Sequence, residues 1–324
     1  MTEPTSVQPT PVPPAPAPAP VDPSPPATSA SRPTGPPRWS RDVIEIAVFR
    51  VLKWIVIAVL VVVTVFPFYY MVVLSLRTLD EVVLRPGLLW PAEFDWSTYT
   101  SVLASPEEGG QGFLVFLRNS AVLAVLTVVF TLLAAVPGAY AISRLQFRGR
   151  RQISALFLAV YLFPAILLAV PLFVFFSAAG LRGSLFGLVV VYVAQTVPIS
   201  IYMLRNYFET VPVSLEEAAA IDGASRFTIL RRVSLPLAMP AVVSNALYVF
   251  MIAWNEFLFA LLFLAERRDR WTVSLGLSQL AGSIEIPTTV LMAGSVLLTL
   301  PIVLLFFLAE RLLVEGLTSG AEKG

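Results

Sequence analysis

The chain has 324 residues, of which 57% are hydrophobic and 13% are charged, and its formal net charge is +1. Soluble domains carry about 25% charged residues, so this composition indicates a membrane as the solvent. Cysteine and histidine are both absent, which excludes disulfides, thiolate nucleophiles, Cys- or His-ligated metal sites and imidazole catalysis. The near-zero net charge gives no reason to expect a nucleic-acid partner.

Residues 1–38 form a tract rich in proline and alanine. Such a segment cannot build a helix and has little apolar surface to bury, so we expect a disordered, partly polyproline II tail. A basic start followed by an early apolar run is missing, which argues against a signal peptide. Residues 39–324 are expected to form one transmembrane domain.

Six segments of that domain are long and apolar enough to cross a hydrocarbon core of about 30 Å. They are predicted near Trp54–Leu76, Ser120–Ile142, Ile153–Ala178, Leu185–Leu204, Ala241–Leu264 and Val290–Leu308. Kinks are expected at their internal prolines, which are Pro67, Pro137, Pro164, Pro171, Pro198 and Pro301. The predicted fold class is an all-α integral membrane protein with six transmembrane helices.

The basic residues predict the orientation. With both termini in the cytoplasm, the outer loops hold seven of them: Arg77, Arg85, Arg118, Arg182, Arg267, Arg268 and Arg270. The other 15 of the 22 lysines and arginines lie inside, as the positive-inside rule prefers. One loop opposes this orientation: Glu266–Arg270 carries three arginines and would lie outside. The inner loop Ser143–Gln152 carries four basic residues, so the predicted orientation is kept.

One polar, helix-capable stretch between apolar segments, residues 214–240, is called the insert below. Ser214 and Glu217 have the spacing of a capping box, in which each side chain bonds the other residue's backbone N–H. The alanines that follow favour a short helix, and Gly223 can end it in a left-handed conformation. Ser225 can cap a second helix that Pro236 ends. By itself, this pattern is also that of a stable hairpin without a partner.

The whole pattern resembles a known family. Glu217-Ala218-Ala219, Gly223 and then Val233-Ser-Leu235-Pro236 are similar to the EAA loop of permease subunits of ATP-binding-cassette importers, which have Ile at the position of Val233. Ala139–Arg150, Ala253–Phe257 and the tail Gly316–Gly324 resemble the carbohydrate branch of the binding-protein-dependent transport inner-membrane components. The likeness is to the second, MalG-type permease of maltose/maltodextrin transporters.

The resemblance implies a subunit of a prokaryotic plasma-membrane importer, for a sugar or oligosaccharide, that alternates access as a separate ATPase works. Implied partners are a homologous second permease, two cytoplasmic ATPase subunits, an extracytoplasmic solute-binding protein and membrane lipid. The residues implied to couple to the ATPase are Glu216, Glu217, Ala218, Ala219, Asp222, Gly223, Arg226, Leu235 and Pro236. A second ATPase contact is implied at Thr318, Ser319, Gly320 and Lys323.

The fifth predicted span contains the polar pair Asn255-Glu256. Insertion of a charged side chain at the bilayer centre costs about 2.5–3.5 kcal/mol, so this pair is expected to face other helices or water. A gate on the sugar path and a helix–helix hydrogen bond are both open readings, and we favour the hydrogen bond for Glu256. The candidate translocation path comprises Asn245, Tyr248, Asn255 and Glu256. Gln195 and Ser244 are further candidates for lining a polar cavity.

The sequence lacks the G-x-x-x-x-G-K-[ST] phosphate loop, so we expect no ATP site, no cofactor and no enzymatic activity of its own. An ion-coupled secondary transporter is the rival interpretation. It would need buried ionisable groups, and Glu256 is the only one within the predicted spans. The same type of importer with another cargo, such as a phosphorylated polyol, also stays open.

Overall fold

The computed structural model describes the backbone of residues 41–283 and 285–321 and the side chains of residues 45–283 and 285–310. The described residues form helices and turns and contain no strand. The predicted tail, residues 1–38, lies outside the described residues. The chain divides into two compact units, residues 1–59 and 60–324, so the division falls within the first helix.

The helices, in chain order, are α1 Arg41–Ser75, α2 Leu79–Leu84, α3 Ser97–Leu103, α4 Phe113–Arg144, α5 Arg150–Leu162, α6 Ala165–Ala178, α7 Leu185–Phe208, α8 Val213–Ile221, α9 Arg226–Ile229, α10 Leu235–Leu237, α11 Met239–Asn255, α12 Leu258–Leu264, α13 Val273–Ala281 and α14 Thr288–Ala321. Short 3-10 turns lie at Pro106–Glu108 and Arg268–Arg270, and a π-helical turn lies at Leu230–Ser234.

Four helices are individually long and apolar enough to span a membrane: residues Glu45–Ser75, α4, α7 and residues Thr288–Glu310. Two bent pairs pass the same test: α5 with α6, at 91°, and Arg226–Leu237 with α11, at 79°. The described residues therefore hold four spans, or up to six when each bent pair counts as one. The chain is a helical, multi-pass membrane protein.

Two predicted spans differ from the structure. The third, Ile153–Ala178, is broken between α5 and α6, because a residue that precedes proline avoids the helical region and Phe163 takes φ −73°, ψ 128° before Pro164. The fifth, Ala241–Leu264, is broken between α11 and α12 at Glu256. Helices instead continue through the other five prolines.

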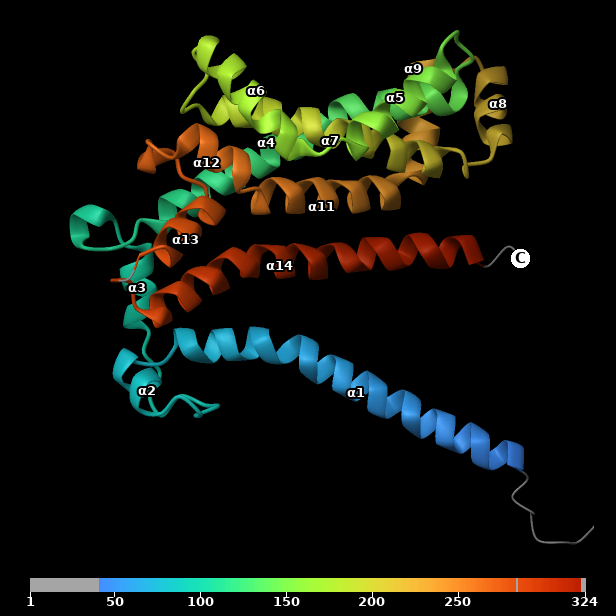
Figure 1. The fold of residues 1–324 in the computed structure, drawn as a ribbon. Helices are drawn as coiled ribbons and strands as arrows, with labels where there is room; N and C mark the ends of the chain where they lie inside the picture. Colours follow the sequence, from blue (N-terminus) through green and yellow to red (C-terminus); the bar gives the residue numbers. More distant parts are fainter. Residues whose placement is uncertain (1–40, 284, 322–324) are drawn as a thin grey trace, which may run out of the picture. The chain divides into compact units, whose positions relative to one another are not determined.

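In the unit of residues 60–324, α4 and α7 pack along each other, and α11 packs on both (Figure 1). Gly138 permits the close approach, since a Cβ there would lie 3.3 Å from Ile201 Cδ1. The hydroxyls of Thr131 and Thr196 are joined by a hydrogen bond of 2.7 Å between the same helices. Small residues and hydrogen bonds of this kind hold helices together in a membrane, because the hydrophobic effect does not favour contact between helices that lipid already surrounds.

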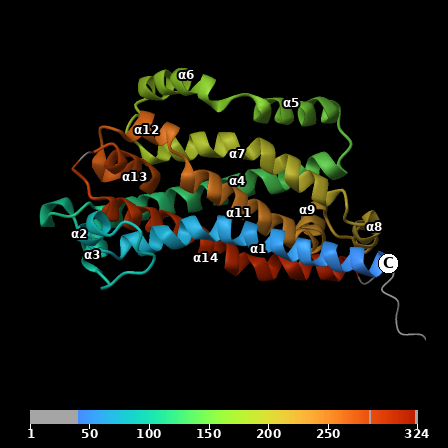
Figure 2. The same ribbon diagram turned by 60° about the horizontal axis from the view of Figure 1, so that its bottom comes forward.

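Both ribbon views place α8 and α9 at one end of the long helices and α3, α12 and α13 at the other (Figures 1 and 2). We call these the α8 end and the α13 end. Each has its own buried cluster, with Tyr140, Phe208 and Leu230 at the α8 end and Phe113, Phe263 and Leu275 at the α13 end. Large apolar side chains on the outer faces, such as Leu133 and Phe307, remain exposed, as suits contact with lipid.

Candidate functional site

The insert forms a knob at the α8 end, consisting of α8, the turn at Gly223 and α9. Gly223 has φ +83°, in the left-handed region. The N–H of Gly223 bonds the carbonyl of Ala220 at 3.0 Å, and the N–H of Ala224 bonds that of Ala219 at 3.0 Å. These two bonds make a Schellman motif, so the prediction that glycine ends this helix is confirmed.

The predicted capping box of Ser214 and Glu217 is wrong. Helix α8 starts at Val213, with Pro212 at the N-cap and no side-chain cap, which places Ser214 inside the first turn. The reason is that proline fixes its own φ and lacks an N–H, so it suits the start of a helix. Both Ser214 and Glu217 are exposed.

Glu216, one of the residues implied to couple to the ATPase, is buried and so does not lie on the surface of the knob. Its Oε1 lies 2.8 Å from Arg144 Nε and accepts a hydrogen bond from Ser234 Oγ at 2.8 Å. Tyr140 donates its hydroxyl to Oε2 at 3.3 Å. Arg144 also donates to the carbonyl of Val211 at 2.7 Å. One carboxylate thus joins α4, α8 and the π-helical turn.

The second helix of the insert is shorter than expected. Ser225 Oγ caps α9 by accepting the N–H of Thr228 at 3.3 Å, as predicted, but α9 ends at Ile229 and a π-helical turn follows. Pro236 does not end the helix. It lies within helical structure that runs from Arg226 to Leu237, just after the π-helical turn. The chain bends at Ala238, before α11.

The tip of the knob carries apolar side chains that the sequence reasoning passed over. Ile221 is 86% exposed and Phe227 is 70% exposed. Asp222 and Arg226 beside them are exposed as well, as is Ala218, while Ala219 is half-buried. The available signal was that both lie next to a charged residue at the turn, Ile221 before Asp222 and Phe227 after Arg226. A fixed apolar pair rimmed by charge is typical of a surface that binds another protein.

The other coupling candidates lie elsewhere. Leu235 packs against the buried cluster of the α8 end, and Pro236 is exposed. Only the backbone is described at Thr318, Ser319 and Gly320, and Lys323 lies outside the described residues, so the second ATPase contact stays a prediction.

A cavity of 510 Å³ lies between α5, α6, α7 and α11. Its lining is mostly apolar and aromatic and includes Tyr248 and Gln195. Gln195 Nε2 is buried and has no hydrogen-bond partner among the described residues. Asn245, also in the candidate path, is buried away from this lining, with its Oδ1 unpartnered among the described residues.

Asn255 and Glu256 lie at the break between α11 and α12. The Glu256 carboxylate accepts the N–H groups of Phe259 and Ala260 at 2.8 and 3.1 Å, and a hydrogen bond from the Tyr192 hydroxyl. From the position before the N-cap Phe257, its side chain satisfies two N–H groups at the start of α12 and ties α12 to α7. Asn255 is exposed and donates to the carbonyl of Met251 at 2.9 Å.

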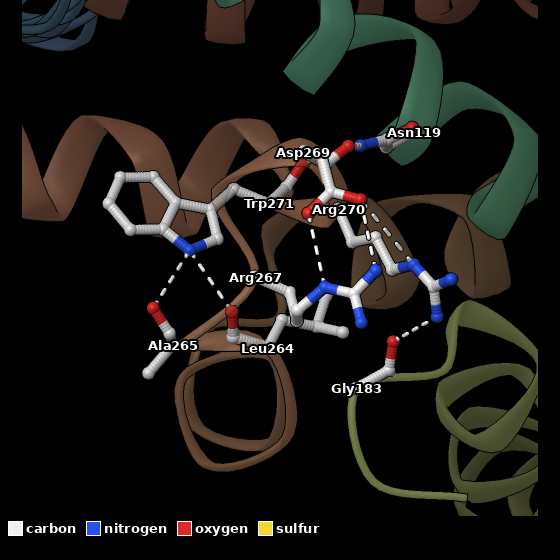
Figure 3. Close-up of polar contacts among 8 residues, drawn as sticks. All are labelled: Asn119, Gly183, Leu264, Ala265, Arg267, Asp269, Arg270 and Trp271. Carbon is white, nitrogen blue, oxygen red and sulfur yellow. Dashed lines mark hydrogen bonds and ion pairs between the residues drawn. The ribbon is translucent and has the colours of Figure 1, made fainter.

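The loop between α12 and α13 is a compact structure at the α13 end (Figure 3). Asn119 Nδ2 donates to the carbonyls of Asp269 and Trp271, both at 3.0 Å, and Arg270 donates to that of Gly183 at 2.5 Å. A hydrogen bond from Arg267 holds the pKa of the Asp269 carboxyl below its usual value. The arginines here are thus held by local contacts.

Comparisons with known proteins bear on this arrangement. The family model described as "Binding-protein-dependent transport system inner membrane component" matches residues 116–318. The Escherichia coli (strain K12) "Inner membrane ABC transporter permease protein YcjP" is 38% identical over 272 residues, covering 83% of this chain and 94% of that protein. The Thermococcus litoralis "Trehalose/maltose transport system permease protein MalG" is 38% identical over 276 residues, covering 85% and 97%.

A solved structure agrees with these relatives. A chain of a bacterial ABC transporter involved in the import of the acidic polysaccharide alginate is 25% identical, with a TM-score of 0.73, covering 85% of this chain and 99% of that one. The matched family segment contains the entire insert and all helices from α7 to α13. The chain therefore belongs to the family of binding-protein-dependent transport system inner membrane components.

Proposed function

We propose that this chain is a membrane-spanning permease subunit of an ATP-driven, binding-protein-dependent importer of a sugar or oligosaccharide. Support for the cargo class comes from the relatives, whose names specify trehalose/maltose and alginate. The aromatic lining of the 510 Å³ cavity and the free amide of Gln195 suit a carbohydrate, which presents both apolar ring faces and hydroxyls. Tyr248 and Gln195 are the residues placed to meet it.

The proposed coupling to the ATPase rests on one observation: the knob has an exposed apolar tip and a base held by a buried ion pair. Ile221 and Phe227 would enter a groove on the ATPase, while Glu217, Asp222 and Arg226 make charged contacts around them. Buried apolar anchors surrounded by polar contacts carry most of the binding energy of protein interfaces. The Glu216–Arg144 pair then transmits the displacement of the knob to α4.

The α8 end is therefore the cytoplasmic end, where two copies of the ATPase would sit, and the α13 end faces the solute-binding protein. The exposed apolar faces of the long helices would meet a homologous second permease and lipid. The positive-inside distribution supports this orientation. Both termini would be cytoplasmic.

The energy must enter through contacts because the sequence has no phosphate loop. ATP binding shifts the balance between inward-open and outward-open states only by its difference in affinity for them. Reversing a balance of 1:99 takes about 5.5 kcal/mol. A knob that moves as one body with α4 is suited to deliver that energy, and the chain itself would have no ATPase activity.

Ion-coupled secondary transport is disfavoured by the state of Glu256. Both oxygens of this carboxylate already accept hydrogen bonds from Tyr192 and the start of α12, which supports a structural role for it. A non-sugar cargo, such as a phosphorylated polyol, stays as the second candidate. A ligand screen on the cognate solute-binding protein separates these cargoes.

The experiment that tests the coupling is replacement of the tip, Ile221→Ser with Phe227→Ser. We expect the variant to insert normally but to lose co-purification of the ATPase and solute uptake. Leu84→Ser is the matched control, since Leu84 is 79% exposed on α2 at the α13 end. Normal ATPase binding by the double variant would refute the assigned role, and uptake by the chain alone down an ion gradient would refute the importer.

A further inference from the structure

A second pocket at the α8 end is not used by the proposed coupling. It has a volume of 440 Å³ and lies where the connection between α4 and α5 meets α7. Its lining consists of Phe147, Gly149, Arg150, Arg151, Gln152, Ser154 and Arg205. The sequence motif that builds it continues from Arg144, but its later arginines have no part in the Glu216 network.

The pocket is positively charged. Glu209 is the carboxylate paired with its arginines, at 2.9 Å from Arg205 Nε and 3.8 Å from an Arg150 terminal nitrogen. Arg151 is exposed. Three arginines against one carboxylate leave a formal charge of about +2 in a concave site, which favours an anion. Guanidinium groups also match the oxygens of a phosphate group in geometry.

Backbone groups add to this charge. The 13-residue helix α5 begins beside the pocket, with Gly149 as its N-cap at φ +90° and no side-chain cap. The N–H groups of the first turn of a helix have no partner within the helix, and they carry a partial positive charge. The start of α5 therefore adds partial positive charge beside Arg150 and Arg151.

The surroundings of the pocket decide between a soluble anion and a lipid. Phe147 in the lining is 39% exposed, and Ile153 and Leu156 on α5 are 38% and 60% exposed. Exposed apolar side chains therefore lie on both sides of the arginines along the chain, and α5 belongs to a candidate membrane span. A ligand that suits both kinds of side chain has a phosphate head and acyl chains.

We propose that this pocket binds the phosphate headgroup of an anionic phospholipid, with its acyl chains along α5. The proposal rests on the proposed orientation, which places the pocket at the cytoplasmic surface of the membrane. There, basic pockets between transmembrane helices meet the headgroups of acidic lipids. The bound lipid would fix the connection between α4 and α5 next to Arg144, and thereby the base of the knob.

The test is a titration of the detergent-purified, full-length chain with phosphatidylglycerol, followed by native mass spectrometry. Arg150→Gln with Arg151→Gln should weaken binding by about fivefold for each arginine. Arg267→Gln with Arg268→Gln is the matched control, because it removes the same charge at the α13 end, and it should bind like the wild type. Glu209→Gln should bind more tightly, since it removes the competing carboxylate.

Three further arms identify the ligand. Phosphatidylcholine should not compete, and millimolar inorganic phosphate should not displace phosphatidylglycerol. Equal weakening in both double variants, or displacement by phosphate, would overturn the proposal. Unchanged lipid binding by Arg150→Gln with Arg151→Gln would also overturn it, and a simultaneous loss of ATPase co-purification would assign the pocket to a protein partner. Arg151→Gln alone serves if the double variant fails to fold, and the lipid titration itself depends on neither the coupling nor the cargo.

Discussion

Arg144 and Glu216 lie 72 residues apart in the chain, and their Nε and Oε1 atoms are 2.8 Å apart. Arg144 is the last residue of α4, and Glu216 lies in the first turn of α8. Their side chains are 8% and 4% exposed. A displacement of the knob therefore cannot leave α4 unaffected without separating two buried charges.

Removal of one member of this pair is expected to destabilise the protein. Glu216→Leu leaves the Arg144 guanidinium buried without its partner, for which the expected cost is about 3–5 kcal/mol. The double change Glu216→Leu with Arg144→Met should recover much of that loss, because no charge then stays unpaired. Thermal unfolding of the detergent-solubilised chain measures both. Equal destabilisation by the single and double variants would show that the pair is not coupled.

Substitution of Gly223 should affect coupling more than insertion. A side chain at φ +83° costs about 1–2 kcal/mol, so Gly223→Val would distort the knob. We expect ATP hydrolysis without uptake in reconstituted vesicles, and the same from Glu217→Arg, which reverses an exposed charge. Gly87→Val is the control, since nothing lies within 4 Å of a Cβ there. Normal uptake by both knob variants would contradict the role of the insert.

Glu256 offers a test of ion coupling. Glu256→Gln keeps one of the two oxygen acceptors at the start of α12, so we expect a smaller loss of stability than from removal of both, and uptake whose pH dependence is unchanged. Glu256→Leu removes both acceptors and should cost about 0.5–2 kcal/mol of stability. Uptake assays across pH and thermal unfolding measure the two effects. A Gln variant that folds normally but no longer transports would revive the ion-coupled alternative.

The outer loop should depend on Asn119 and hardly on the Asp269 side chain. Asn119 is 4% exposed and holds two loop carbonyls, so Asn119→Ala is expected to destabilise the loop by about 1–3 kcal/mol. Asp269→Asn changes an exposed ion pair, worth little. Faster hydrogen exchange over residues 265–271 in the Ala variant alone would confirm this. Equal acceleration in both variants would assign the loop's order to its surface charges.

Several features of the fold could be predicted because they depend on local properties. Long apolar runs indicated the membrane helices, Gly223 the end of α8, and Ser225 the cap of α9. The breaks were predicted less well. Pro164 breaks a span in which a kink was expected, and Pro236 lies inside helical structure, because neighbouring residues decide whether a proline bends a helix or ends it.

The sequence alone determined the solvent, the number of apolar segments, the position of the insert and the family resemblance, since these follow from composition and spacing along the chain. Only the tertiary structure decided which charges face outward. Glu216 and Glu217 are adjacent and chemically alike, yet α8 turns one inward to Arg144 and the other to solvent. Contacts between residues 72 positions apart leave no local signal, because the energy that fixes them arises only when the helices pack.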